Sequence, residues 1–255
     1  MSKLPKKHRF VDLSDYGRPA GKKIAILLKN TSATPIHITL SFVVCGIMAT
    51  ICILLQYYWA AAVLLVIKSI LDAADGELAR LKKTPSYTGR YLDSISDIIL
   101  NILLLTTIWY VTEGSVIFTI LALFGLQLQG TLYNYYYVIL RNRFNGDTTS
   151  RVFENEVPKA MAGEKQQHVT LLFNIYHFFY GPFDKIIYRL DREAVEGKEL
   201  PKWFMTTVST FGLGFQLLII GGMLVFDLKD YIIPFFIGFS LLIFIFIGLR
   251  RFLNR

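Results

Sequence analysis

LDAADGELARLKKTPSYTGRYLDSISDIIL, residues 71–100, places acidic side chains between two apolar runs of membrane-spanning length. A charged side chain near the centre of a bilayer costs about 3 kcal/mol or more, so carboxylates in this position need a compensating partner. A metal ion can compensate several carboxylates at once. The stretch therefore predicts a metal site at the edge of a membrane, built from Asp72, Asp75, Asp93 and Asp97.

The spacing of these aspartates predicts two acidic pairs on two helices. Asp72 and Asp75 are three residues apart, and Asp93 and Asp97 are four apart, so each pair shares one face of a helix. Pro85 breaks the helix in the short link between them, which makes the two helices an antiparallel hairpin. Converging carboxylates repel one another, and one or two divalent cations relieve that repulsion. Mg²⁺, Mn²⁺ and Ca²⁺ all suit oxygen ligands, and spacing alone does not choose among them.

Small residues and one arginine accompany the acidic pairs. Gly76 and Ala79 lie on the same turns as the first pair, where small side chains let a bulky ligand approach the helix backbone. Arg80 supplies a permanent planar cation suited to phosphate. Gly89 allows close approach where the second helix begins. Together these residues predict a site for a metal and a diphosphate.

The complete spacing, D-x2-D-G-x2-A-R-x8-G-x3-D-x3-D, resembles the signature of the CDP-alcohol phosphotransferase family. Every fixed position of that signature is matched, by Asp72, Asp75, Gly76, Ala79, Arg80, Gly89, Asp93 and Asp97. The resemblance implies an integral membrane enzyme that transfers a substituted phosphate group from a CDP-alcohol to an acceptor alcohol and releases CMP. It also implies a homodimer. We expect two metal ions, either Mg²⁺ or Mn²⁺.

The resemblance also implies roles for single residues. It assigns Asp97 as the catalytic base that takes the proton of the acceptor hydroxyl. The metal ligands would be Asp72, Asp75 and Asp93, with Asp97 shared between the two roles. The residues that shape the CDP pocket would be Asp72, Gly76, Ala79, Arg80 and Gly89.

Lys68 is a further candidate contact, because it lies inside an apolar run four residues before Asp72. An intramembrane lysine should point at a polar cavity, and we expect it to pair with Asp72 or to reach a bound phosphate. The alternative is a lysine paired with a carbonyl or with another helix.

His37 and Arg141 are also candidates for phosphate or acceptor contacts. His37 belongs to Thr34-Pro35-Ile36-His37-Ile38-Thr39, which resembles a T-P-N-x-x-T element of the family that borders the nucleotide pocket. Ile36 replaces the asparagine of that element, and His37 is the candidate substitute for its nucleotide contact. In the alternative interpretation, Thr34 caps a helix that begins at Pro35, and His37 lies at the membrane interface without a role in binding. Arg141, Arg143 and Arg151 lie where an anionic acceptor could dock or where headgroups could be anchored.

Composition indicates a polytopic membrane protein. The chain has 255 residues, of which 53% are hydrophobic, and its mean hydropathy is +0.45. The net charge of +8 does not indicate a nucleic-acid partner, because the basic residues lie in alternate loops beside the apolar runs, where anionic lipid headgroups would contact them.

Hydropathy predicts an all-α bundle of six transmembrane helices forming one domain over residues 1–255. Residues 1–30 are expected to include an amphipathic helix on the membrane surface, and residues 141–202 to form a cytoplasmic or interfacial insertion of one or two helices. The excess of Lys and Arg in alternate links places both termini and the acidic motif in the cytoplasm, with the cell (inner) membrane as location. The six predicted spans are residues 35–55, 58–80, 91–111, 115–140, 204–226 and 231–249.

The predicted activity is a step of phospholipid synthesis, with CDP-diacylglycerol as the expected donor. The acceptor stays open among glycerol 3-phosphate, inositol phosphate and serine, and a CDP-choline or CDP-ethanolamine donor also fits the motif. One alternative is an intramembrane prenyltransferase, but its acidic blocks usually lie in separate halves of the chain, whereas both blocks here fall within residues 72–97. Another is a cation transporter, which would place acids on distant spans and carry an internal repeat.

Overall fold

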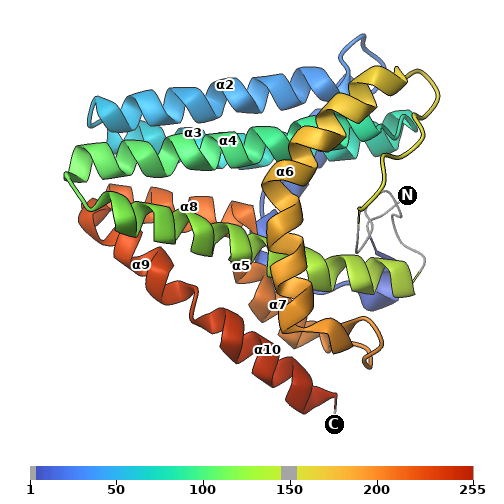
Figure 1. Cartoon of the computed structure of the whole chain (residues 1–255). Helices are drawn as coiled ribbons and strands as arrows, with labels where there is room; N and C mark the ends of the chain where they lie inside the picture. Colours follow the sequence, from blue (N-terminus) through green and yellow to red (C-terminus); the bar gives the residue numbers. More distant parts are fainter. Residues whose placement is uncertain (1–3, 145–153, 255) are drawn as a thin grey trace.

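A computed structural model describes residues 4–144 and 154–254, and this part of the chain contains helices and no strands (Figure 1). The all-α prediction is therefore confirmed. The helices are α1 (Arg18–Leu28), α2 (Pro35–Leu54), α3 (Tyr58–Lys82), α4 (Tyr87–Thr112), α5 (Val116–Arg143), α6 (Gln166–Leu190), α7 (Lys202–Val208), α8 (Leu213–Val225), α9 (Ile232–Phe239) and α10 (Leu242–Leu253).

Four segments in the described part of the chain are long and apolar enough to cross a membrane. They are α2, α4, α5 and the segment Lys229–Leu253, which contains α9 and α10. The bent pair Lys202–Phe211 and Leu213–Val225, with an angle of 54°, makes a fifth if it is one span. Helix α3 has 25 residues, but Lys68, Asp72 and Asp75 interrupt its apolar run. These helices indicate an integral membrane protein with four or five apolar spans, and a total of six stays a prediction.

Local signals in the sequence explain where the helices of the hairpin and α2 begin. Thr34 caps α2, Pro35 takes its first position, and His37 completes a capping box. After Pro85, the hydroxyl of Ser86 accepts the backbone N–H of Gly89 and so caps α4. The predicted antiparallel hairpin is therefore present as α3 and α4.

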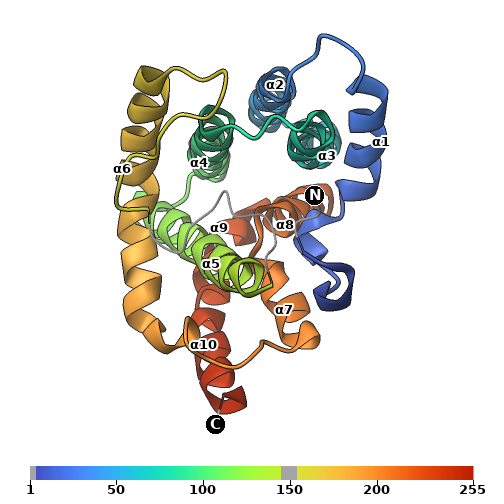
Figure 2. The same cartoon turned by 90° about the vertical axis from the view of Figure 1, so that its right-hand side faces the viewer.

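The hairpin is flanked by other helices on both sides. Figure 2 shows α1 beside α3 and α6 beside α4, with α5 and α8 on the other side of the hairpin from α2. Helix α6 crosses α4 and α5 at a steep angle. The axes of α2, α3 and α4 are nearly aligned, with neighbouring helices of the hairpin running in opposite directions (Figure 1). The ends of α3 and α4 that carry the aspartates are thus surrounded by other elements.

Within the predicted insertion, residues 166–190 form one continuous helix, α6, although Gly181 and Pro182 lie within it. Helix α6 buries Val169, Phe173 and Tyr176 and exposes other apolar side chains such as Phe178. It is amphipathic, and it is not among the membrane-capable helices. Its place at the bilayer surface stays a prediction, as does that of α1, whose residues Gly21 and Ala25 are buried.

Candidate active site

Three of the four aspartates meet between α3 and α4. Asp72, Asp75 and Asp93 each offer one carboxylate oxygen, and these three oxygens lie within 4.8 Å of one another. The helical spacing of Asp72 and Asp75 places both on the side of α3 that faces α4, and the antiparallel hairpin brings Asp93 level with them. Of the four aspartates that the sequence predicts to converge, these three do, and Asp97 is not part of the group.

Asp97, the fourth aspartate, is joined to this group through Lys68. The Lys68 ammonium donates to Asp97 Oδ1 at 2.5 Å and to Asp72 Oδ2 at 3.3 Å. The lysine is only 2% exposed, and its Nζ atom lies 4.6 Å from the ring centroid of Phe42 on α2. The contact with Asp72 agrees with the expectation from the sequence, and the contact with Asp97 agrees with the stated alternative of a pairing with another helix, although that partner was not named.

Asp75 and Asp93 differ in how their oxygens are satisfied. The hydroxyl of Thr39 on α2 donates to Asp75 Oδ2 at 2.7 Å, in a buried contact. Asp93 Oδ1 is buried and has no hydrogen-bond partner among the described residues. An unsatisfied buried oxygen is costly, so its position beside two other carboxylates fits a cation ligand. The role of Thr39 was missed, although a threonine at the start of an apolar span was a usable signal.

The small residues and the arginine of the motif lie at the start and end of the hairpin helices. The nearest atoms to a Cβ added at Gly76 would be those of the Arg80 guanidinium, at 3.5 Å, so the Arg80 side chain lies over this glycine. Arg80 pairs with Glu77 at 3.0 Å, and Ala79 beside it is half-buried. Gly89 lies in the first turn of α4. The structure thus brings Gly76 and Arg80 together on α3, close to Asp72 and Asp75 in sequence.

The two remaining candidates, His37 and Arg141, lie on α2 and α5. His37 is exposed, and its Nδ1 accepts the backbone N–H of Thr34 at 3.3 Å, so this nitrogen serves the helix cap. Arg141 lies on α5 and is 7% exposed, with its guanidinium 5.1 Å from the ring centroid of Tyr137. Arg143 donates to the carbonyl of Gly197. Arg151 lies outside the described residues.

Helix α6 touches the acidic part of α4, which the sequence did not indicate. The hydroxyl of Tyr180 donates to the carbonyl of Ser94 at 2.8 Å, and Ser94 lies between Asp93 and Asp97 in the chain. Burial raises the pKa of Tyr180, and the nearby carboxylates of Asp97 and Asp93 raise it further. The insertion therefore forms one wall of the site.

The segment that leads into α6 binds the start of α4 through two glutamates. Glu154 accepts hydrogen bonds from the Arg90 guanidinium and, at 2.9 Å, from the Tyr91 hydroxyl. Glu164 accepts the backbone N–H of Thr88 at 2.6 Å and the Ser86 hydroxyl at 2.8 Å. Burial alone would raise the pKa of Glu164, but these hydrogen bonds lower it on balance. The insertion thus fixes the turn from which Asp93 and Asp97 project.

Comparison with known families agrees with this geometry. The profile of the family described as CDP-alcohol phosphatidyltransferase matches residues 32–192, which include α2 to α6 and every residue of the acidic motif. No curated protein matches the chain. The match covers more than half of the 255 residues, and it indicates a transferase of phospholipid synthesis. The chain therefore belongs to the CDP-alcohol phosphatidyltransferase family.

Proposed function

We propose that this protein transfers a phosphatidyl group from CDP-diacylglycerol to an acceptor alcohol and releases CMP. The observation that carries the proposal is the meeting of Asp72, Asp75 and Asp93 within 4.8 Å, with Asp97 one helical turn beyond Asp93. Family membership supports the reaction class and favours it over a prenyltransferase or a cation transporter. The choice of donor rests on the position of the site in a bundle of apolar helices, where acyl chains can enter from the bilayer.

The acidic centre fits a divalent cation. Three carboxylate oxygens lie close enough to share one ion, and the buried Asp93 Oδ1 lacks any other partner among the described residues. Asp72, Asp75 and Asp93 would hold Mg²⁺ or Mn²⁺, and Asp97 would be shared with a second ion. When bound, such ions neutralise negative charge on the diphosphate of the donor and on the transition state.

In this proposal, Asp97 is the base of the reaction. The acceptor oxygen attacks the phosphorus that carries the lipid, the bond from that phosphorus to CMP breaks, and the hydroxyl proton passes to the Asp97 carboxylate. Lys68 holds Asp97 and Asp72 at the same time, and so fixes the direction in which the base points. Transfer is direct, because no serine, cysteine or histidine nucleophile is needed.

The remaining motif residues would bind the nucleotide. The small side chains of Gly76 and the half-buried Ala79 would let a bulky group approach α3 beside the Arg80 guanidinium. Arg80, already oriented by Glu77, would contact a phosphate, and Gly89 would keep the start of α4 free of side-chain atoms.

The proposed topology has six spans, with α3 as the span that carries the first acidic pair. Both termini and the active site would face the cytoplasm at the cell (inner) membrane, since Lys and Arg are concentrated in the N-terminal segment, the α3–α4 link and the C-terminal tail. Water-soluble acceptors would then arrive from the cytoplasm and the lipid donor from the bilayer. A homodimer is part of the proposal on the basis of the family resemblance.

CMP release from CDP-diacylglycerol tests the proposal directly. The purified protein should release CMP with at least one alcohol from a panel of serine, ethanolamine, glycerol 3-phosphate and inositol phosphate, and only when Mg²⁺ or Mn²⁺ is added. Asp75→Ala should lose both CMP release and the thermal stabilisation that CDP gives in the presence of metal, because one carboxylate of the acidic centre is gone. If no acceptor yields CMP with either metal, the proposal fails.

A further inference from the structure

Tyr180 on α6 contacts the backbone of the acidic part of α4. Its hydroxyl donates to the carbonyl of Ser94 at 2.8 Å, and Ser94 directly follows Asp93 and lies three positions before Asp97. Burial raises the pKa of Tyr180, and the charges of Asp97 and Asp93 raise it further, so the hydroxyl stays protonated and remains a donor. A permanent donor from another helix therefore holds the backbone between two residues of the acidic motif.

This hydrogen bond is additional to those that form α4 itself. Ser94 lies inside the helix Tyr87–Thr112, where its carbonyl accepts the backbone N–H four residues later. A carbonyl oxygen has two lone pairs, so it can also accept the Tyr180 hydroxyl. Because this bond is made to the backbone, it fixes the position and rotation of α4 against α6, rather than the rotamer of one side chain.

The geometry of the acidic centre depends on the position of α4. Asp93 and Asp97 belong to α4, whereas Asp72 and Asp75 belong to α3. The oxygens of Asp72, Asp75 and Asp93 lie within 4.8 Å of one another across these two helices. A shift of α4 by about 1 Å would move Asp93 and Asp97 together relative to α3, and a displacement of that size can lower a reaction rate about 10²-fold.

Neighbouring side chains fix the direction of the Tyr180 hydroxyl. The ring of Tyr176, one turn earlier on α6, stacks on the Tyr180 ring with centroids 4.8 Å apart and an interplanar angle of 14°. Tyr176 in turn packs on Tyr91 of α4 with centroids 5.1 Å apart. The side-chain amide of Gln127 on α5 donates to the Tyr180 hydroxyl. The phenol is thus oriented by groups on three helices before a substrate arrives.

We propose that Tyr180 is a positioning residue of the reaction and acts through the Ser94 carbonyl. It sets Asp97 for proton transfer and Asp93 for metal binding. Lys68 holds the Asp97 side chain from α3, and Tyr180 holds the backbone of the same turn from α6. This role needs no contact between Tyr180 and the reacting atoms. The inference rests on the proposed function, because it assigns the part that α6 has in that reaction.

Tyr180→Phe tests the inference, because it removes one oxygen atom and keeps the ring. With CDP-diacylglycerol and an active acceptor at saturating metal, kcat should fall about tenfold or more. The KM for CDP-diacylglycerol should change little, since the proposed nucleotide contacts Gly76 and Arg80 lie on α3. The affinity for Mn²⁺ alone, measured from the electron paramagnetic resonance signal of free Mn²⁺ in detergent, should fall severalfold. That measurement needs no turnover.

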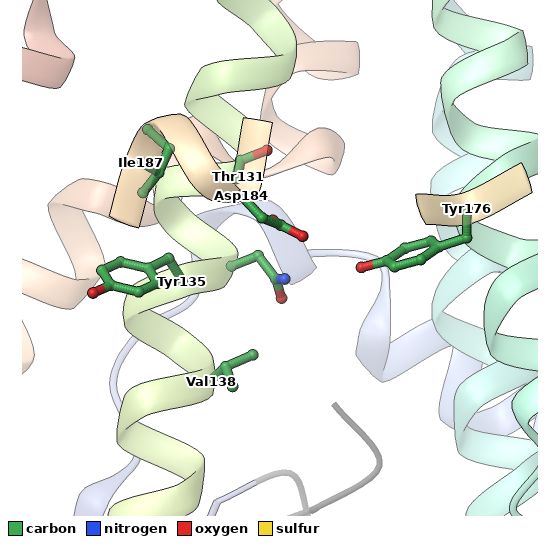
Figure 3. Close-up of a pocket in the computed structure, with 7 residues that line it drawn as sticks. Thr131, Tyr135, Val138, Tyr176, Asp184 and Ile187 are labelled. Atoms are coloured by element: carbon green, nitrogen blue, oxygen red, sulfur yellow. The ribbon is translucent and has the colours of Figure 1, made fainter. Parts of the chain in front are cut away.

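Tyr135→Phe is the matched control. The Tyr135 hydroxyl also donates to a backbone carbonyl, that of Asp191, at 3.0 Å in a buried contact. Asp191 follows the last residue of α6 and lies about 16 Å along that helix from Tyr180. Figure 3 shows the Tyr135 hydroxyl directed away from Tyr176. Each variant loses one such hydrogen bond, so both should unfold at a lower temperature, but Tyr135→Phe should keep the wild-type kcat and Mn²⁺ affinity.

A double variant tests whether Tyr180 acts through the base. In the Asp97→Asn background at saturating metal, Tyr180→Phe should cause little further loss of turnover, because the group that it positions is already removed. A further tenfold loss, as in the wild-type background, would show that Tyr180 does not act through Asp97 and would overturn the inference.

The remaining outcomes separate this inference from the proposed function. Equal losses of kcat in Tyr180→Phe and Tyr135→Phe would mean that only stability is affected, and the inference would be wrong. It would also be wrong if Tyr180→Phe kept the wild-type kcat and Mn²⁺ affinity. A wild-type protein that releases no CMP refutes the proposed reaction, whereas the Mn²⁺ affinities of the two variants still decide whether Tyr180 positions the acidic centre.

Discussion

Lys68 shows how one side chain can link two halves of a site. Buried at 2% exposure, it donates to one aspartate on its own helix and to another on the next helix. Its contact with Asp72 follows from a spacing of four residues on one helix face. The contact with Asp97 depends on the register of α3 against α4, which the helical period alone does not determine. This is why the sequence named Asp72 as a partner but gave the second helix only as an alternative, without the residue.

Asp97→Asn should separate binding from chemistry. An amide of the same shape still accepts a hydrogen bond from Lys68 but cannot take a proton from the acceptor, so we expect CMP release to fall by about 10²–10⁴-fold. The thermal stabilisation by CDP and metal should persist, because Asp72, Asp75 and Asp93 remain. Asp227→Asn, at an exposed aspartate, is the control. Turnover by Asp97→Asn within a few-fold of wild type would show that another group is the base.

Among the elements, the hairpin was predictable and the insertion only in part. The α3–α4 hairpin follows from signals close together in the chain, namely the helical spacing of the aspartates, Pro85 and the Ser86 cap. The bonds from Glu164 to Ser86 and Thr88 join residues more than 70 positions apart. Contacts between residues so far apart produce no periodic pattern of apolar residues. The sequence therefore predicted amphipathic helices in the insertion, but it did not predict that α6 packs against the acidic site.

Close packing of α1 on α3 gives a prediction about the N-terminal segment. A Cβ atom at Gly21 would lie 2.9 Å from the backbone N of Ala74 and the carbonyl of Ile70, both on the helix that carries Asp72 and Asp75. Gly21→Ala should therefore destabilise the protein by about 1–3 kcal/mol, because backbone atoms cannot yield as a flexible side chain would. The loss should appear as a lower unfolding temperature in detergent together with reduced CMP release.

Gly222→Ala is the matched control, since a Cβ atom there meets nothing within 4 Å. Both glycines lie in helices, so alanine favours the helical backbone by up to about 1 kcal/mol in each case. Gly222→Ala should thus be neutral or slightly stabilising, and the two variants should differ in sign. An equal effect of both substitutions would mean that α1 does not pack against α3 in the membrane.

At the scale of the whole molecule, a buried ion pair ties the end of the insertion to the last helix. Arg250 on α10 is 1% exposed and donates to Asp191, which directly follows α6 and is itself 0% exposed. The hydroxyl of Tyr136 on α5 donates to the same carboxylate at 2.7 Å. In the sequence, Arg250 belongs to a basic tail that was interpreted as a topology signal. A run of basic residues does not reveal which member is buried, because its partner lies 59 positions away.

Arg250→Met should therefore destabilise the whole bundle more than any change at the exposed arginine next to it. Removing Arg250 leaves the buried Asp191 carboxylate with only the longer contact to the exposed Arg251, and breaking such a buried pair costs about 3–5 kcal/mol, which should lower the unfolding temperature by roughly 10 °C. Arg251→Met is the comparison: Arg251 reaches the same Asp191 carboxylate, but at 3.7 Å and with a side chain that is 54% exposed, and such exposed pairs contribute little.

Combining Arg250→Met with Asp191→Leu should recover part of the lost stability, since the double variant leaves no unpaired charge in the contact between α6, α5 and α10. Thermal unfolding of the wild-type, single and double variants in the same detergent measures this coupling. If Arg250→Met unfolds at the same temperature as Arg251→Met, or if the two changes simply add, the ion pair does not hold the C-terminal helix to the insertion. In that case the packing of Phe246 and Ile247 in the same core would have to anchor α10 alone.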